Sequence, residues 1–140
     1  MTAVAPGCVF CAIAAGDIPA SMVLRDDDVA AFLDTRPVFK GHVLIVPRTH
    51  VPTLSDVPAA DLGTLFTAVQ RIARAVESGL GADGTFVAMN NKVSQSVPHL
   101  HVHVVPRKKK DGLRGFFWPR VSYADDAERE AFAARIRAAI

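Results

Sequence analysis

The feature that most constrains this chain is the alternation His99-Leu100-His101-Val102-His103, in which three imidazoles are separated by apolar residues. Successive side chains of a strand point to opposite faces, so an extended segment would line up the histidines on one face. On a helix the same histidines would share no surface. The β-branched valines favour a strand. We therefore predict a strand with a face of imidazoles, against the alternatives of incidental histidines or a surface metal patch.

Length and charge narrow the class of protein. A chain of 140 residues predicts one domain with its own core, spanning 1–140, with a flexible lead-in at 1–7 and a C-terminal extension and helix over 107–140. The net charge of +2 indicates no particular partner. The basic run Arg107–Lys110 is more typical of a solvated turn than of a nucleic-acid site. No apolar run could span a bilayer and no signal peptide is recognisable, so we expect a cytoplasmic protein without a membrane partner.

Two cysteines, Cys8 and Cys11, form a Cys-x-x-Cys pair near the start of the chain. In a cytoplasmic protein they are expected to be thiols or metal ligands rather than a disulfide. A zinc half-site would need two further ligands from elsewhere. A redox pair would normally lie in a βαβ unit, which this chain lacks, and two packed apolar cysteines are the third interpretation.

The remaining pattern predicts an α+β fold: an antiparallel sheet of about five strands with one long covering helix and a C-terminal helix. Apolar residues recur at spacings of three and four from Leu62 to Val76, which indicates one broad helical stripe. Besides the histidine strand, the expected strands are 22–25, 29–34, 41–48 and 85–89. The expected helices are a short one starting at Cys8, a long one over 58–79 and a terminal one over 125–140.

A face of imidazoles supports two kinds of chemistry. Neutral imidazole, with a free pKa of roughly 6.5, is a nucleophile, a general base and a metal ligand at neutral pH. Glycine-rich phosphate loops are absent from the sequence. Either a histidine attacks phosphorus while its neighbours hold the phosphate oxygens, or the histidines bind a metal.

The segment Gln95–Val105 resembles the signature of the histidine-triad (HIT) family of nucleotide hydrolases and transferases, His-φ-His-φ-His-φ-φ with φ apolar. The likeness extends over Cys8–Ala20, Phe32–Asp34 and Gly41–His50, and all five histidines fall at positions that matter in that family. The chain looks most like the branch of small homodimers that act on purine nucleoside phosphoramidates and related adenylates.

The resemblance implies a role for each residue that matches the family motif. His101 corresponds to the nucleophile, His103 to a contact with the phosphate or leaving group, and His42 to a histidine packed behind the nucleophile. Asp34 corresponds to the carboxylate that binds both ribose hydroxyls. The other implied substrate contacts are Asn90, Gln95 and Ser96 at the phosphate or leaving group and Phe10, Phe32 and Leu33 around the base.

The resemblance also gives the cysteines a role. Some members hold zinc with a Cys-x-x-Cys pair and two histidines, which here would be Cys8, Cys11, His50 and His99. Four protein ligands are typical of a closed, structural site. We therefore expect structural zinc and no organic cofactor.

This chain departs from the family pattern in two places. The loop between Asn91 and Gln95 is about two residues shorter than is usual, and the residue before Gln95 is Ser94 where glycine is common. The segment 112–120, which contains Phe116, Phe117 and Trp118, is longer than in minimal members. We expect it to be a core flap, a dimer contact or a lid on the leaving-group side.

Three functions are compatible with the sequence and with the resemblance. The first is hydrolysis of purine nucleoside phosphoramidates or related conjugates through a covalent nucleotidyl-histidine, releasing a nucleoside monophosphate. The second is dinucleoside polyphosphate hydrolysis or nucleotidyl transfer with the same nucleophile. The third is a zinc-stabilised binding module in which catalysis is vestigial.

Overall fold

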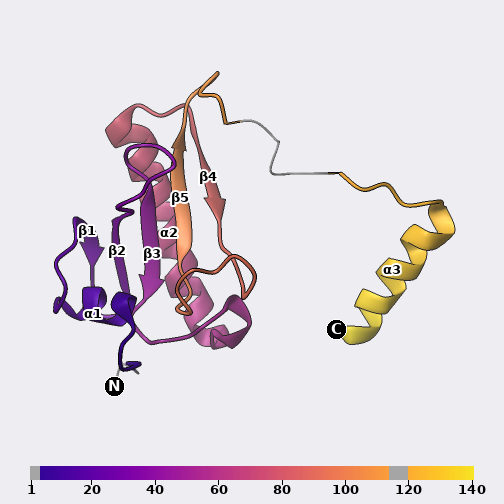
Figure 1. Ribbon diagram of the computed structural model, residues 1–140, viewed down its shortest axis with the longest axis horizontal. Coiled ribbons are helices and arrows are strands. Elements are labelled where there is room, and N and C mark those ends of the chain that lie inside the picture. Colours follow the sequence, from indigo (N-terminus) through magenta and orange to yellow (C-terminus); the bar gives the residue numbers. More distant parts are fainter. Residues whose placement is uncertain (1–3, 114–119) are drawn as a thin grey trace.

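The computed structural model describes residues 4–113 and 120–140 and confirms the α+β architecture. Five antiparallel strands form one sheet in the order β1-β2-β3-β5-β4 (Figure 1). The predicted segment with Phe116, Phe117 and Trp118 lies outside the described residues. The elements are α1 (Val9–Ala15), β1 (Met22–Arg25), β2 (Val29–Leu33), β3 (Val43–Pro47), a 3-10 turn (Leu54–Asp56), α2 (Ala59–Leu80), β4 (Gly84–Ala88), β5 (Val102–Arg107) and α3 (Asp126–Ala139).

The β1–β2 hairpin turns at the acidic triplet Asp26–Asp28, which lies between two of the predicted strands. The Asp26 carboxylate accepts hydrogen bonds from the backbone N–H groups of Asp28 and Val29, both at 2.8 Å. A short acidic side chain that bonds the backbone two and three residues ahead stabilises a turn without a metal. The triplet therefore has a structural explanation.

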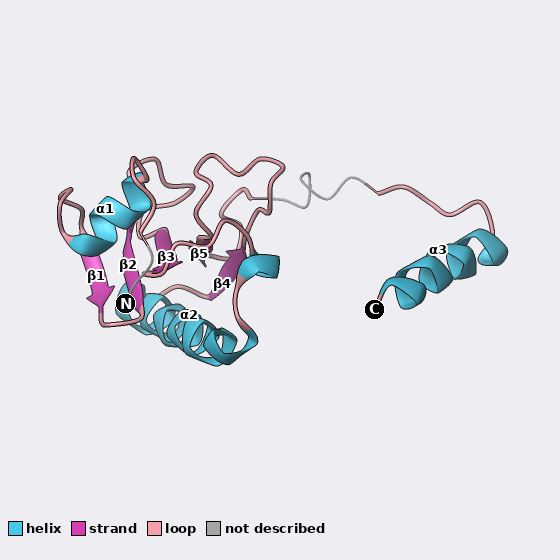
Figure 2. Ribbon diagram, turned by 90° about the horizontal axis from the view of Figure 1, so that it is seen from below, coloured by secondary structure: helices cyan, strands magenta, loops and turns pink. Residues whose placement is uncertain are grey.

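The sheet is buried on both faces, which explains its continuous apolar strands. On one face Ala31 and Ile45 pack with residues of α2, and on the other Phe32 and Leu44 pack with α1. Figure 2 shows the two helices on opposite sides of the strands. The α2 face is sealed by a large helix, whereas the α1 face is covered by only seven helical residues. The lighter cover leaves room for a site on the α1 face.

Helix α2 follows the predicted stripe. Leu65, Val69, Ile72 and Val76 are buried, and each such side chain contributes roughly 1.5–3 kcal/mol by leaving water. The helix ends at Gly81, whose left-handed conformation (φ 62°) is favourable for glycine. Phe66, expected in the stripe, is 39% exposed at the edge of the buried face.

The histidine segment differs from the prediction. Strand β5 begins at Val102, so His99 and His101 precede it and only His103 belongs to the strand. The pairing of β3 with β5 covers Ile45↔Val102 to Val43↔Val104 and no residue before them. The backbone N–H of Leu100 instead bonds the carbonyl of Val51 at 2.8 Å, outside the sheet ladder.

Helix α3 forms where predicted, with the Asp125 side chain accepting a hydrogen bond from the Glu128 N–H at its N-terminus. None of its residues is buried. Figures 1 and 2 show it standing apart from the sheet and α2. Among the described residues no helix has both the length and the apolarity to cross a membrane.

Candidate active site and metal centre

Five histidines from different parts of the chain lie next to one another along β3. His42 precedes β3, His50 follows it, His99 and His101 lie before β5, and His103 is on β5. At most 4% of the surface of His42, His99 and His101 is exposed to solvent. The rings contact one another in sequence, with centroids 4.8 Å apart for His50 and His99 and 5.0 Å for His101 and His103. Buried imidazoles at such distances favour chemistry over a solvated surface role.

The four predicted metal ligands lie together. The Cys8 and Cys11 sulfurs are 3.4 and 3.5 Å from Nδ1 of His99, and the Cys11 sulfur is 3.4 Å from Nδ1 of His50. The two Nδ1 atoms are 3.2 Å apart. All four ligand atoms lie within 4.8 Å of one another. The structure therefore brings the whole predicted set, Cys8, Cys11, His50 and His99, to one point.

These separations match the edges of a zinc tetrahedron. With Zn–N bonds of about 2.05 Å and Zn–S bonds of about 2.3 Å, tetrahedral geometry places two nitrogens about 3.3 Å apart and a nitrogen and a sulfur about 3.6 Å apart. The His99 Nε2–H donates to the carbonyl of Pro47 at 2.7 Å, which leaves the Nδ1 lone pair free for a metal. Burial raises the pKa of the Cys11 thiol, so its thiolate needs a neighbouring cation.

The predicted nucleophile, His101, is fixed by one backbone bond. Its Nδ1–H donates to the carbonyl of His99 at 2.7 Å, so the lone pair of the neutral ring is on Nε2. The ring also packs edge-on against Phe10, with centroids 5.0 Å apart. A neutral imidazole held in this tautomer can attack an electrophile through Nε2.

His42 and His103 form a second pair beside it. The backbone N–H of Val38 donates to Nδ1 of His42 at 3.1 Å, so the proton of the neutral His42 ring is on Nε2. That Nε2–H donates to Nδ1 of His103 at 2.9 Å, which leaves the His103 proton on Nε2. Burial lowers the pKa of both rings, to about 4 for His103, so both are neutral at pH 7.

Asp34 lies next to this pair. One of its oxygens accepts the Arg36 N–H at 2.9 Å and the other is 3.8 Å from Nδ1 of His42. Its negative charge opposes the effect of burial on the pKa of both histidines. Two predicted base-pocket residues, Phe10 and Phe32, are in edge-to-face contact at 5.4 Å. The third, Leu33, is 37% exposed.

The predicted phosphate contacts are in the loop before the histidines. The Gln95 amide donates to the carbonyl of Pro52 and accepts the Lys92 N–H. The Asn90 amide donates to the carbonyl of Ser94 at 3.2 Å. Ser96 is exposed. In this structure the two amides hold the loop, and the Ser96 side chain has no hydrogen-bond partner among the described residues.

The contacts that sequence reasoning missed are backbone groups. The carbonyls of Pro47 and His99 and the N–H of Val38 set the tautomers of three imidazoles. Every residue type carries such groups, so no letter of the sequence marks them.

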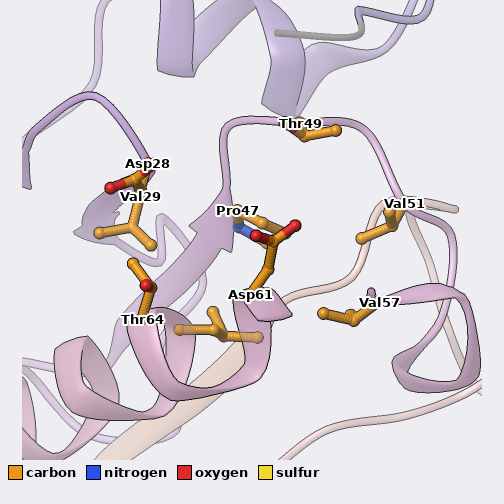
Figure 3. A pocket seen from close by; sticks show the side chains of 9 residues that line it. Asp28, Val29, Pro47, Thr49, Val51, Val57, Asp61 and Thr64 are labelled. Carbon is orange, nitrogen blue, oxygen red and sulfur yellow. The ribbon is translucent and has the colours of Figure 1, made fainter. Parts of the chain in front are cut away.

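A separate cavity lies on the other side of the sheet. It has a volume of about 90 Å³ and is bounded by Val29, Pro47, Asp61 and Thr64, among other residues. Figure 3 shows Asp61 and Thr64 of α2 facing the ends of β2 and β3. Ligand pockets usually measure about 300–1,000 Å³, so this cavity is too small for a nucleotide. Its lining contains no histidine or cysteine.

Comparison with known proteins identifies relatives of this chain. A family model of the HIT domain matches residues 15–110. The chain is 40% identical over 128 residues to "Protein hit" of Bacillus subtilis, covering 90% of this chain and 87% of the relative. It is 30% identical to adenosine 5'-monophosphoramidase hnt1 of Schizosaccharomyces pombe, covering 80% and 83%. It is 39% identical to an asymmetrical bis(5'-nucleosyl)-tetraphosphatase of that yeast, covering 59% and 46%.

Solved structures agree with the fold, and one of them holds zinc. A crystal structure of a HIT family member from Bacillus subtilis superimposes with a TM-score of 0.84 at 34% identity, covering 96% of this chain and 97% of that one. A zinc-bound histidine triad protein from Mycobacterium smegmatis superimposes with a TM-score of 0.73 at 38% identity, covering 96% and 98%.

Proposed function

Because the chain belongs to the HIT domain family, we propose that it hydrolyses purine nucleoside phosphoramidates or related nucleotide conjugates and releases a nucleoside monophosphate. The observation that carries this proposal is the His101 ring, whose Nδ1–H bond to the carbonyl of His99 leaves the Nε2 lone pair free. Burial keeps the neighbouring His103 neutral with its proton on Nε2. A nucleophile and a hydrogen-bond donor therefore lie side by side.

In the proposed first step, Nε2 of His101 forms a bond to the α-phosphorus and the bond to the leaving nitrogen breaks. The leaving amine takes a proton from solvent through a water that accepts the Nε2–H of His103. In the second step, water attacks phosphorus, the N–P bond breaks and the nucleoside monophosphate leaves. The attacking water returns one proton to solvent, which balances the proton taken up by the amine. Fixed placement and aimed donors supply the rate gain.

The proposed substrate contacts follow from their positions. Phe10 and Phe32 form the apolar wall next to His101, which suits a purine ring. Asp34 is assigned to the ribose hydroxyls because a carboxylate has two acceptor oxygens. Ser96, being exposed, is assigned to the phosphate, with Asn90 and Gln95 shaping the loop around it.

The test removes the nucleophile. His101→Ala and His101→Gly are expected to lower the turnover of an adenosine phosphoramidate by at least about a thousandfold relative to the native protein. Their affinity for the nucleoside monophosphate should stay within a few-fold of the native affinity. Added imidazole should restore part of the turnover in His101→Gly only. Mass spectrometry of acid-quenched protein should detect the nucleotidyl adduct in the native protein and in neither variant. Undiminished turnover in the alanine variant refutes the proposal.

Dinucleoside polyphosphate hydrolysis is the second candidate, favoured by the likeness to the yeast tetraphosphatase. It uses the same nucleophile and differs in the leaving group. A panel of phosphoramidates, adenylates and dinucleoside polyphosphates, with products identified by chromatography, separates the two. If no substrate turns over but nucleotide binds, the chain is a binding module with vestigial catalysis.

We also propose that Cys8, Cys11, His50 and His99 hold a structural zinc ion, because their separations fit its tetrahedron and because a zinc-bound relative has the same fold. Bound metal stabilises a protein by about 4 kcal/mol when present at a thousand times its Kd. Removing it with a chelator is therefore expected to lower the free energy of unfolding by several kcal/mol. The measurement is urea denaturation with and without chelator, alongside metal analysis. Well below one zinc per chain in protein purified without chelator would contradict this proposal.

A homodimer of the full 1–140 chain is the assembly we propose. Helix α3 presents Phe132, Ile136 and Ile140 on one face, at exposures of 45%, 64% and 100%. Apolar groups in such a row on a soluble helix normally face a partner. The edge strand β4 adds Val87, which is 43% exposed, on a strand without a charged residue.

A further inference from the structure

His99 takes part in three interactions at once. Its ring Nδ1 faces the sulfurs of Cys8 and Cys11, its ring Nε2–H donates to the carbonyl of Pro47, and its own carbonyl accepts the Nδ1–H of His101. The residue is fully buried. One residue therefore joins the proposed metal centre to the proposed nucleophile.

The sheet does not hold this segment. The β3–β5 ladder starts at Val102, so neither His99 nor His101 has a strand partner on β3. Outside the strand ladder, the Leu100 N–H donates to the carbonyl of Val51 and the His99 N–H donates to the carbonyl of Val97, both at 2.8 Å. The His99 carbonyl shares a planar peptide with the Leu100 N–H. Its direction therefore depends on two anchors, the Leu100 bond to Val51 and the fixed His99 ring.

We propose that His99 is a positioning residue through which the bound metal orients the His101 nucleophile. The metal fixes the His99 ring from the Nδ1 side and the carbonyl of Pro47 fixes it from the Nε2 side. The ring and the Leu100 bond to Val51 together fix the carbonyl that holds the His101 proton on Nδ1 and leaves Nε2 free. This proposal rests on the proposed function only for the consequence of that orientation, and its structural part stands alone.

Removing the metal is expected to disturb the orientation of His101. Without the metal, Nδ1 of His99 is left against thiols and a second imidazole, which are weak partners for it. The His99 carbonyl then loses one of its two anchors, and the tautomer and direction of His101 are less firmly fixed. Residues that orient a reacting group typically contribute about ten- to a hundredfold. The loss should appear mainly in kcat, with a smaller change in KM because Phe10, assigned to the base, lies between Cys8 and Cys11.

The first experiment observes the proton directly. Nitrogen-15 NMR of the zinc-loaded protein should show the His101 Nδ1–H as a downfield signal protected from exchange. That signal is expected to broaden or vanish after chelation and in Cys8→Ser. The matched control, His50→Cys, keeps four ligands in a Cys3His set and should keep the signal. The amide signals of α2 report that the rest of the fold is intact.

The second experiment covers the case in which stripped protein unfolds. Cadmium forms longer bonds to thiolates than zinc does, and it should load the same four ligands without unfolding the chain. The exchange of zinc for cadmium should shift the His101 Nδ1 resonance more than the His103 resonances. Equal shifts at both residues overturn the proposal.

The kinetic arm separates this proposal from the proposed function. Cys8→Ser is expected to lower kcat at least tenfold, with a smaller change in KM. A His101 signal that is unchanged after chelation in folded protein overturns the positioning role, whatever the activity. A signal that responds to the metal in a protein without turnover supports the positioning role and rejects the proposed function.

Discussion

At the scale of single residues, the imidazoles of the site differ because each has a different backbone partner. The carbonyl of Pro47 accepts the Nε2–H of His99, so the lone pair of that ring is on Nδ1. The carbonyl of His99 accepts the Nδ1–H of His101, so the lone pair of His101 is on Nε2. The N–H of Val38 donates to Nδ1 of His42, so the His42 proton is on Nε2. The histidines themselves could be identified from sequence because three of them recur at a period of two. Their tautomers could not, because tautomers depend on main-chain groups that every residue possesses.

Buried His103 predicts a pH dependence of stability. Its pKa is about 4 in the folded protein, mainly through desolvation, and roughly 6.5 when unfolded. Between these values the unfolded chain binds more protons, so stability is full above about pH 6.5 and falls as the pH drops toward 4. The loss assignable to His103 is at most about 3 kcal/mol. His103→Asn should therefore show a smaller difference in unfolding free energy between pH 7.5 and pH 5 than the native protein.

The comparison of these two proteins must be made with zinc present in both, so that acid release of the metal contributes equally. His42 also titrates with a lowered pKa, and it is retained in both proteins. An equal pH dependence of the two unfolding free energies would show that His103 is not desolvated in the folded state.

At the scale of elements, helix α2 and the β1–β2 hairpin follow from sequence because each has its own local signal. Helix α2 has a stripe of period 3.6 and a glycine at its end, and the hairpin has the Asp26 turn. The start of β5 could not be read in this way. The alternation of His99 to His103 predicts a strand from its first residue. Instead, the His99 ring bonds the carbonyl of Pro47 at the end of β3 and the Leu100 N–H bonds the carbonyl of Val51, both outside the strand ladder. Long-range partners therefore decide where the ladder begins.

The loop before the histidines gives a second prediction at this scale. Ser94 has a left-handed backbone (φ 60°), a conformation that costs a non-glycine residue about 1–2 kcal/mol. Glycine avoids this cost and gives back about 0.5–1 kcal/mol through its freer unfolded chain. Ser94→Gly is therefore expected to raise the free energy of unfolding by about 0.5 kcal/mol, as measured by urea denaturation.

Ser96→Gly is the matched control, because Ser96 is also exposed and does not have a positive φ. It is expected to lower stability. If both glycine variants lower it equally, the left-handed conformation of Ser94 is not a source of strain.

At the scale of the whole molecule, α3 is the element without a described place to pack. It stands apart from the sheet and from α2, and its Phe132 and Ile136 are exposed. A helix with such an apolar face is expected to be held by another molecule. A second copy of the chain is the partner we propose.

Two variants test this proposal. Phe132→Glu and Ile136→Glu place a charge on the apolar face of α3, and both should shift the protein from dimer to monomer in sedimentation at micromolar concentration. Ala134→Glu is the control, because this residue lies on the opposite face of the same helix and is also exposed. A native protein that sediments as a monomer, or variants that all remain dimeric, would contradict the role of α3.

The position of Cys8 near the start of the chain has a practical consequence for producing the protein. A polyhistidine tag fused to residue 1 would bring extra imidazoles within seven residues of a proposed zinc ligand. Such a tag could compete for the ion, or deliver nickel from the affinity resin to the four ligands. Protein purified through a cleavable solubility partner, or without a tag, is therefore the appropriate material for measuring metal content. The same purified protein should be used for every comparison between loaded and stripped forms.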